Sequence, residues 1–222
     1  MNQHMQQKLV LFDIDYTLFD TDAYRVKLYP QLAKKLGIID ENFFILAKKI
    51  SDERKLTNKH FSPDKFLQEL LLNSTTSVTI GELEQLFWNE ELYSEVLDNE
   101  SNNTLKELQR YGVQIGLLST GDTKHQLAKV NTLLLYLGEN HRHIFPNKLA
   151  SLGDVLERYE EFQVYLVDDL PEVLAKAKSI DSKIITILRH VNKKFEVTPQ
   201  VSNFSPDWTI NEISEVIDIV AS

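Results

Sequence analysis

Apolar positions along the chain follow two different spacings, and the change between them divides the sequence. Residues 8–12 form a short, fully apolar run that ends in acidic residues, a pattern typical of a buried strand in a parallel sheet. From Asp22 to about Tyr93, apolar residues recur three and four positions apart, which predicts about four helices with no strand between them. Thr79 and Glu82 form a capping-box pattern at the start of one of these helices. The first predicted strand is therefore followed by a block of helices.

The spacing changes again after the polar stretch at residues 98–103, where short apolar runs begin to alternate with helical patterns. We expect helices over residues 105–111, 123–137, 149–159, 171–179 and 212–221, and strands over residues 113–118, 142–145, 163–167 and 183–188. Strands that alternate with helices predict an α/β fold, in which helices cover both faces of a parallel sheet. The helical block from about Asp22 to Asp98 is then an insertion into the sheet domain.

Composition excludes several classes of protein. The chain has 222 residues, of which 42% are apolar and 26% charged, a balance typical of a folded soluble protein. Its 33 acidic residues outnumber 24 basic ones, and the formal charge of −9 disfavours nucleic acid as a partner. Because there is no cysteine, disulfides, thiol nucleophiles and cysteine-ligated zinc are excluded. Residues 1–8 are polar and no membrane-spanning run follows, so we expect a cytoplasmic protein without membrane contact.

Polar residues with chemical potential follow the predicted strands. Asp13 and Asp15 come directly after the first strand, Ser119 after the second, and Asp168 with Asp169 after a later one. In an open parallel sheet, ligands bind beyond the carboxyl ends of the strands, so these side chains are expected to meet at one edge. Two carboxylates about 4 Å apart repel each other by roughly 4 kcal/mol at an effective dielectric near 20. The cluster therefore predicts a bound cation or a proton, and ligands that are all oxygen favour magnesium.

Each of these residues also has an ordinary structural interpretation. Asp13 alone is compatible with a turn, Ser119 with a helix cap, and Lys148 with a solvated surface. Asp122 or Thr123 is interpreted as a helix cap, since Thr123 and Gln126 form a second capping-box pattern. What favours a functional site is the combination, because acids, a hydroxyl, a lysine and a second acid pair fall at successive strand ends in one order.

That order resembles the four motifs of the haloacid dehalogenase-like (HAD) hydrolase superfamily. The matching elements are residues 13–18 (DIDYTL), Ser119, Lys148 and the pair Asp168-Asp169. The resemblance spans residue 8 to about residue 190, and the helical insertion is similar to the α-helical cap of the phosphoglycolate phosphatase-like branch. It implies a Rossmann-like, three-layer α/β core with an inserted helical cap.

The resemblance also implies a domain division and an activity. The core would comprise residues 1–21 and 99–222, and the cap residues 22–98. The activity would be Mg²⁺-dependent hydrolysis of a small phosphorylated metabolite. A haloacid dehalogenase, a phosphomutase and a non-catalytic phosphate-binding protein of the same fold remain alternatives. Asp15 argues against the dehalogenase, because displacement of a halide needs no acid for the leaving group. The sequence predicts neither the substrate nor the oligomeric state.

The roles implied by the resemblance fall into three sets. The catalytic residues would be Asp13 as nucleophile, Asp15 as general acid and base, and Lys148 as a cation shared by phosphate and Asp13. The phosphoryl oxygens would be held by Ser119, Thr120 and Gly121. The magnesium ligands would come from Asp13, the Asp15 carbonyl, Asp168 and Asp169. Which acid of the last pair contacts the metal directly is left open.

Two departures from the family pattern bear on the site. Position 16 is Tyr where Gly is common, which is expected to narrow the entrance beside the nucleophile. Lys148 is followed by Leu149 where Pro is frequent, so Lys124 remains a second candidate for the lysine role. Lys148 is preferred because it follows the third strand and approaches the edge of the sheet from a third direction.

Other polar and aromatic residues are expected to be structural. The segment His141-Arg142-His143 is interpreted as an exposed loop, and Trp88 and Trp208 are interpreted as core residues. A basic run in the helical block is expected to be a solvated face, with contact to an anionic substrate tail as the alternative. It comprises Lys48, Lys49, Arg54, Lys55 and Lys59.

Overall fold

The centre of the molecule is a six-stranded sheet in which every neighbouring pair is parallel. The structure is a computed structural model that describes residues 6–56, 61–196 and 201–221. The spatial order of the strands is β3-β2-β1-β4-β5-β6. Their bounds are Gln7–Phe12 for β1, Gln114–Thr120 for β2, Arg142–Phe145 for β3, Phe162–Asp168 for β4, Ile185–Arg189 for β5 and Trp208–Ile210 for β6. The α/β fold and the Rossmann-like core expected from the sequence are confirmed.

Alternate side chains of the central strand β1 enter two separate apolar layers, as the two-residue period of a strand requires. Val10 and Phe12 belong to one buried cluster, and Leu9 and Leu11 belong to the other. All four side chains are fully buried. A strand with apolar residues on both faces needs a cover on both faces, which explains why residues 8–12 show no polar alternation.

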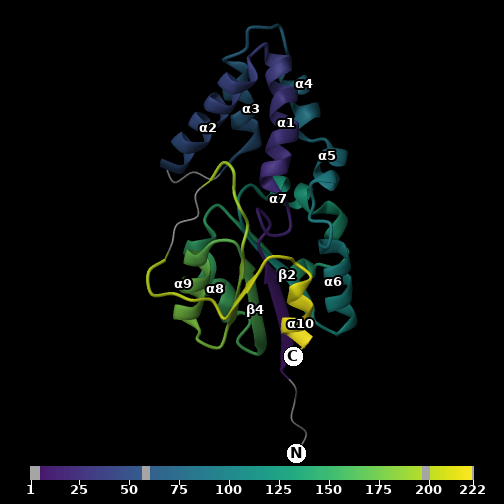
Figure 1. The fold of residues 1–222 in the computed structure, drawn as a ribbon, viewed down its shortest axis with the longest axis vertical. Helices are drawn as coiled ribbons and strands as arrows, with labels where there is room; N and C mark the ends of the chain where they lie inside the picture. Colours follow the sequence, from purple (N-terminus) through teal and green to yellow (C-terminus); the bar gives the residue numbers. More distant parts are fainter. Residues whose placement is uncertain (1–5, 57–60, 197–200, 222) are drawn as a thin grey trace, which may run out of the picture.

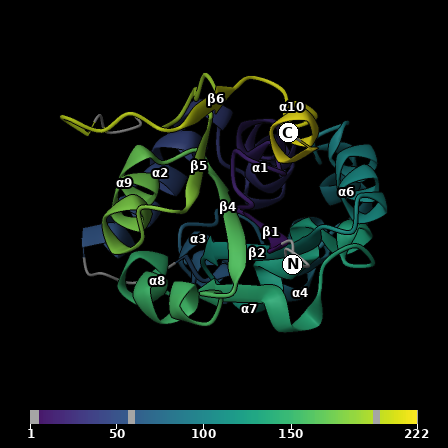
Figure 2. The ribbon, with the colours of Figure 1, turned by 90° about the horizontal axis from the view of Figure 1, so that it is seen from below.

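Helices on the two sides of the sheet supply these covers (Figure 2). One face is covered by α6 (Ser101–Arg110) and α10 (Glu215–Ala221), and the other by α8 (Lys148–Glu157) and α9 (Pro171–Ile180). The molecule therefore has the three layers of a doubly wound fold, with the carboxyl ends of β1, β2 and β4 open at one edge.

A block of helices lies beyond that edge of the sheet (Figure 1). Outside residues 57–60, it contains five helices where the sequence pattern predicted about four: α1 (Thr21–Leu36), α2 (Asp40–Leu56), α3 (Pro63–Leu71), α4 (Ile80–Phe87) and α5 (Glu90–Glu95). The capping box of Thr79 and Glu82 is present at the start of α4. The chain enters and leaves the block side by side, because Phe19 pairs with Leu97 in an antiparallel bridge.

Three expectations about elements were wrong. The helix expected over residues 123–137 ends early: α7 spans Thr123–Lys129, and only a short 3-10 turn, Asn131–Leu133, follows. Strand β6 was missed, and Trp208 on it is 51% exposed because β6 is the edge strand of the sheet. His143 was expected in an exposed loop but is buried on β3, where it lies 2.6 Å from the Tyr159 hydroxyl. Within the described ranges, no helix is long and apolar enough to cross a membrane.

Candidate active site

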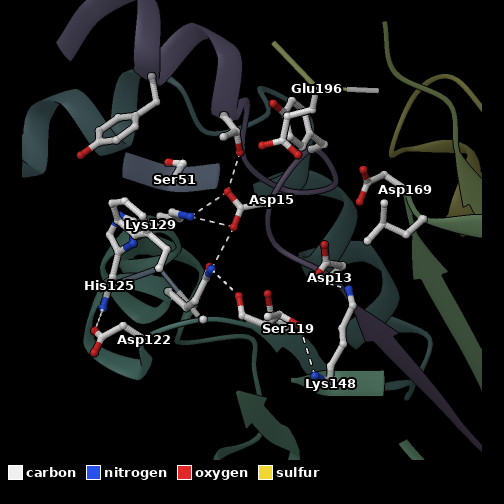
Figure 3. A pocket seen from close by; sticks show the side chains of 18 of the residues that line it. Asp13, Asp15, Ser51, Ser119, Asp122, His125, Lys129, Lys148, Asp169 and Glu196 are labelled. Carbon is white, nitrogen blue, oxygen red and sulfur yellow. Dashed lines mark hydrogen bonds and ion pairs between the residues drawn. The ribbon is translucent and has the colours of Figure 1, made fainter. Parts of the chain in front are cut away.

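Charged residues from three strand ends meet in a buried cluster at the open edge of the sheet. Asp13 follows β1, Lys148 begins α8 after β3, and Asp168 ends β4. The Lys148 Nζ atom lies 2.8 Å from Asp13 Oδ1 and 2.6 Å from Asp168 Oδ2. With Ser119 from β2 and Asp169, these residues form what we name the floor of the site (Figure 3). All five side chains are buried.

The three carboxylates of the floor fit a divalent cation. Asp13, Asp168 and Asp169 each place one oxygen within 4.8 Å of the other two. In the described part of the chain, neither Asp13 Oδ1 nor Asp169 Oδ2 accepts a hydrogen bond, although each is in contact with a lysine ammonium. Burial, opposed in part by lysine charges, raises the pKa of both Asp168 and Asp169. Crowded, buried carboxylate oxygens are the ligands that a hard cation such as Mg²⁺ takes, and here lysine ammonium groups occupy two of them.

The loop after β2 brings the predicted phosphate-binding residues to the same edge. The Lys148 backbone N–H donates to Thr120 Oγ1 over 3.2 Å, which ties the loop to α8. Gly121 has φ of 148°, and a Cβ atom there would lie 2.7 Å from the Gln126 side chain. A side chain at position 121 is therefore excluded by both backbone conformation and space. Ser119, Thr120 and Gly121 therefore line the same cavity as Asp13, Lys148 and Asp169.

Asp15 stands apart from the carboxylate cluster, and its carboxylate is held by three polar side chains (Figure 3). Lys129 Nζ lies 2.7 Å from both carboxylate oxygens, Thr21 Oγ1 donates over 2.5 Å, and Gln126 Nε2 donates over 2.9 Å. Burial alone would raise the pKa of Asp15, but the Lys129 charge and these hydrogen bonds outweigh burial and hold that pKa well below its usual range. The Asp15 side chain is therefore an ionised, oriented carboxylate in this arrangement.

The sequence analysis missed Lys129 and assigned Gln126 wrongly. Gln126 does not complete a capping box with Thr123, because the N-cap of α7 is Asp122, which accepts from the His125 N–H. Its amide reaches Asp15 instead. Nothing in the sequence marks Lys129 as a site residue. Lysines are common in the last turn of a helix, where their positive charge interacts favourably with the helix dipole.

The two candidate lysines point in different directions. Lys148 contacts Asp13 and Asp168 within the floor. Lys124 lies over the ring of Trp88 in the helical block, with its Nζ 4.3 Å from the ring centroid. Only Lys148 is thus within reach of a group bound to Asp13.

This architecture matches solved structures closely, whereas no family model and no curated protein matches the sequence. A haloacid dehalogenase-like hydrolase from Burkholderia xenovorans has a TM-score of 0.78 at 21% identity, covering 98% of each chain. A phosphatase of that superfamily from Thermococcus onnurineus has a TM-score of 0.65 at 19% identity, over 96% of this chain and 98% of that one. A hydrolase from Bacillus subtilis bound to magnesium has a TM-score of 0.64 at 14% identity, covering 98% of this chain and 100% of that one. The chain has the haloacid dehalogenase-like fold.

Structures with the haloacid dehalogenase-like fold that resemble this one also include a β-phosphoglucomutase and a dehalogenase. The likeness therefore establishes the fold and leaves the reaction to be argued from the site. The strand-end residues named from the sequence lie together at the open edge of the sheet, and their roles remain predictions.

One feature of the site has no counterpart in the four motifs of the haloacid dehalogenase-like fold. Residues 191–196, which follow β5 and are named the strap here, run from the core to the helical block. Lys193 forms a buried ion pair with Asp169, and Glu196 pairs with Arg25 of α1 at 2.8 Å. The ring of Phe195 stacks on Phe44 of α2. The sequence analysis missed the strap, because a polar segment between strands gives no signal of burial.

Tyr16, which stands where the family that the sequence resembles commonly has Gly, has a left-handed backbone with φ of 59°. That conformation favours Gly and is costly for an aromatic residue. The side chain is fixed by its surroundings: its hydroxyl donates to Asp22 over 2.7 Å and accepts from Arg25 over 2.9 Å, and Lys193 Nζ lies 4.7 Å from the ring centroid. Tyr16 thus lines the cavity together with Asp13.

A cavity of about 470 Å³ lies between the floor and the helical block. Its wall on the side of the helical block is largely aromatic. We name this wall the aromatic roof, and it consists of Tyr24, Tyr29, Phe61, Phe66 and Phe87. The cavity is therefore charged at one end and apolar at the other.

Proposed function

We propose that this protein is a Mg²⁺-dependent phosphomonoesterase that works through a phosphorylated Asp13. The observation that carries the proposal is the buried contact of Asp13 with Lys148, beside Asp168 and Asp169, while Asp15 is held separately two residues further along the chain. A carboxylate nucleophile beside cations, with a second carboxylate outside the cluster, is the set that phosphoryl transfer in two steps requires.

In the first step, an oxygen of Asp13 attacks phosphorus, and the bond from phosphorus to the alcohol oxygen breaks. The Lys148 ammonium balances negative charge on the phosphoryl oxygens and on Asp13, and Ser119 with the loop amides of Thr120 and Gly121 orients the group. When bound by Asp13, Asp169 and the Asp15 carbonyl, with Asp168 in support, Mg²⁺ would neutralise the crowded negative charge.

Asp15 has a role in both steps. As an acid it gives a proton to the departing alkoxide, and as a base it takes a proton from the water that attacks the phosphorylated Asp13. That attack breaks the acyl phosphate bond and releases inorganic phosphate. The ionised Asp15 held by Lys129, Thr21 and Gln126 is the form that the second step needs. For the first step, Asp15 must carry a proton. The ion pair between its carboxylate and the Lys129 ammonium must therefore be broken before the alkoxide departs.

The test is phosphate release by the purified protein from a panel of phosphomonoesters, with Mg²⁺, after chelation, and after Mg²⁺ is restored. We expect release only when the metal is present, and full release in chelator would contradict the metal assignment. Chloroacetate is included as a substrate for the dehalogenase alternative. Sustained chloride release would favour that alternative, which the acidic side chain at Asp15 disfavours.

A further inference from the structure

The aromatic roof gives the cavity a wall of aromatic rings, of which Tyr24, Phe66 and Phe87 are at most 5% exposed. The Phe61 centroid lies 5.2 Å from Phe66 and 6.3 Å from Phe87, and the centroids of Tyr24 and Phe87 are 6.2 Å apart. These separations are typical of attractive aromatic packing, so the rings form one continuous wall. Such a wall favours a flat apolar group and gives little to a polyhydroxylated one.

The roof is not wholly apolar, because Tyr24 and Tyr29 carry hydroxyls and His125 lies beside them; the Tyr24 hydroxyl already donates to the Phe87 carbonyl oxygen over 3.0 Å. The His125 ring lies 5.1 Å from Phe87 and 5.4 Å from Phe61, is 5% exposed, and lines the cavity. Its Nε2 atom has no hydrogen-bond partner among the described residues. Burial, aided by the Lys129 charge, holds the pKa of His125 well below its usual value, so the ring is neutral. A buried, unpaired ring nitrogen needs a partner, and a ligand in the cavity would supply one.

The basic side chains that line the described part of the cavity are all engaged with carboxylates. Arg25 on the roof side lies 2.8 Å from Glu196 and 3.7 Å from Asp22. The remaining pairs are Lys129 with Asp15, Lys148 with Asp13 and Asp168, and Lys193 with Asp169. A ligand with a second anionic group would therefore have to break an existing ion pair. This arrangement disfavours a carboxylate or a second phosphate on the leaving group.

The two lysines of the basic run whose side chains the structure describes, Lys48 and Lys49, do not bring a free positive charge to the cavity. Lys48 and Lys49 are 68% and 70% exposed at the side chain, and each forms an ion pair with an acid one turn further along α2. Neither lines the cavity. The side chains of Arg54 and Lys55, and all of Lys59, lie outside what the structure describes. For the two lysines that are described, the solvated-face interpretation agrees with the structure.

We propose that the leaving group is an uncharged alcohol bearing a flat apolar ring, which packs on the aromatic roof and forms one hydrogen bond with His125 Nε2. The proposal rests on the proposed function only in placing the phosphoryl group at the floor. In the view of Figure 3, Asp15 lies between the floor and His125. With the phosphoryl group at the floor and the ring at the roof, the oxygen that joins them would lie beside the Asp15 carboxylate.

The test uses binding of phosphonates, which cannot be hydrolysed, to the full chain with Mg²⁺, measured by titration calorimetry. Benzylphosphonate supplies the ring, methylphosphonate lacks it, and 4-carboxybenzylphosphonate adds an anion to the ring. We expect benzylphosphonate to bind at least about tenfold more tightly than either of the others. Equal or tighter binding of the carboxylated compound, or of methylphosphonate, would overturn the proposal.

Two variants locate the selectivity on the roof. Phe61→Leu should weaken benzylphosphonate at least about threefold and leave methylphosphonate unchanged. The matched control is Phe162→Leu, the same change at a partly buried ring on the opposite edge of the sheet, which should alter neither affinity. A loss of ring selectivity in the control alone, or in both variants equally, would contradict the assignment.

The hydrogen bond is tested with 4-(hydroxymethyl)benzylphosphonate. In the wild-type protein the added hydroxyl should tighten binding, and His125→Phe should remove that gain while keeping the affinity for benzylphosphonate. A gain retained in His125→Phe would overturn the role of His125. Phosphate release separates the two proposals: release with a preference for phosphoglycolate would refute the ring proposal alone. Ring-selective binding without release from any ester would refute the phosphatase alone.

Discussion

The floor and the aromatic roof of the cavity are stable for different reasons. The floor buries three carboxylates, whose desolvation is costly and is offset in part by Lys148, Lys193 and the Leu170 N–H, which donates to Asp168. The roof buries phenylalanine and tyrosine rings, which stabilise the fold by about 1.5–3 kcal/mol for each side chain removed from water. A change in the floor should therefore alter the chemistry more than the stability. A change in the roof should do the reverse.

The largest expected effect is on catalysis, from Asp13→Asn. An amide of nearly the same shape is a poor nucleophile, so turnover should fall by at least about 10⁴-fold. The free energy of unfolding should change by less than about 1 kcal/mol, because Lys148 keeps Asp168 as its partner. Phosphate release and denaturant unfolding measure the two effects. Wild-type release by the variant would refute the covalent mechanism.

The next effect is on stability, from Phe66→Ala in the roof. The Phe66 side chain is 1% exposed, and its removal should cost about 3–5 kcal/mol of unfolding free energy. The control is Lys65→Ala, an exposed neighbour on the same helix, which should cost less than about 0.5 kcal/mol. Similar losses in both variants would show that the roof is not a packed part of the core.

Within the floor, Lys148→Ala should lower turnover at least about 100-fold, equivalent to about 2.7 kcal/mol of transition-state stabilisation. Lys124→Ala should lower it less than about tenfold, because that ammonium lies over Trp88 and not at the floor. The two variants are compared side by side in steady-state kinetics. The reverse ranking would reassign the lysine role.

Asp15→Asn should affect alkyl phosphates more than aryl phosphates, since an alkoxide needs protonation and a phenolate needs little. We expect the losses in kcat to differ by about tenfold, equivalent to about 1.4 kcal/mol. The measurement is kcat for one ester of each type in variant and wild type. Equal losses would remove the acid role from Asp15 without affecting Asp13.

The smallest expected effect is on metal affinity, from Lys193→Met. The ammonium of Lys193 contacts Asp169 and repels a divalent cation bound at that carboxylate. Removing it should tighten Mn²⁺ binding about threefold in titration calorimetry. Lys194→Met is the control, because the Lys194 side chain is exposed and only its backbone N–H contacts Asp22. Unchanged or weaker Mn²⁺ binding in Lys193→Met would contradict the competition between the Lys193 ammonium and the cation for the Asp169 carboxylate.

The floor was predictable from the sequence, and the reason is topological. Carboxyl ends of parallel strands meet at one edge, so residues that directly follow apolar runs share a site whatever their separation along the chain. Asp13, Ser119 and Asp168 satisfy that rule. It required only the strand pattern, which residues 8–12 and their later counterparts show clearly. The metal and catalytic roles of these residues remain predictions.

The partners that complete the site were not predictable in the same way. Lys129 reaches the cavity from the last turn of α7, Lys193 from a polar loop and His125 from the first turn of α7. Many lysines and histidines at such positions simply face solvent. Strand β6 was missed because three residues give too short an alternation to detect. Tyr16 did carry a signal: a family position that favours Gly indicates a backbone with positive φ.

The position of the helical block has a consequence for the order in which the chain folds during synthesis. Helices α1 to α5 find most of their packing partners within their own segment, although α5 also packs on α7, whereas β1 pairs with strands that follow roughly 100 and 150 residues later. We expect the block to gain amide-exchange protection before the sheet does, which pulse-labelled refolding would detect. Until β2 and β4 emerge from the ribosome, β1 remains an unpaired apolar strand, the segment of this protein most exposed to misassociation.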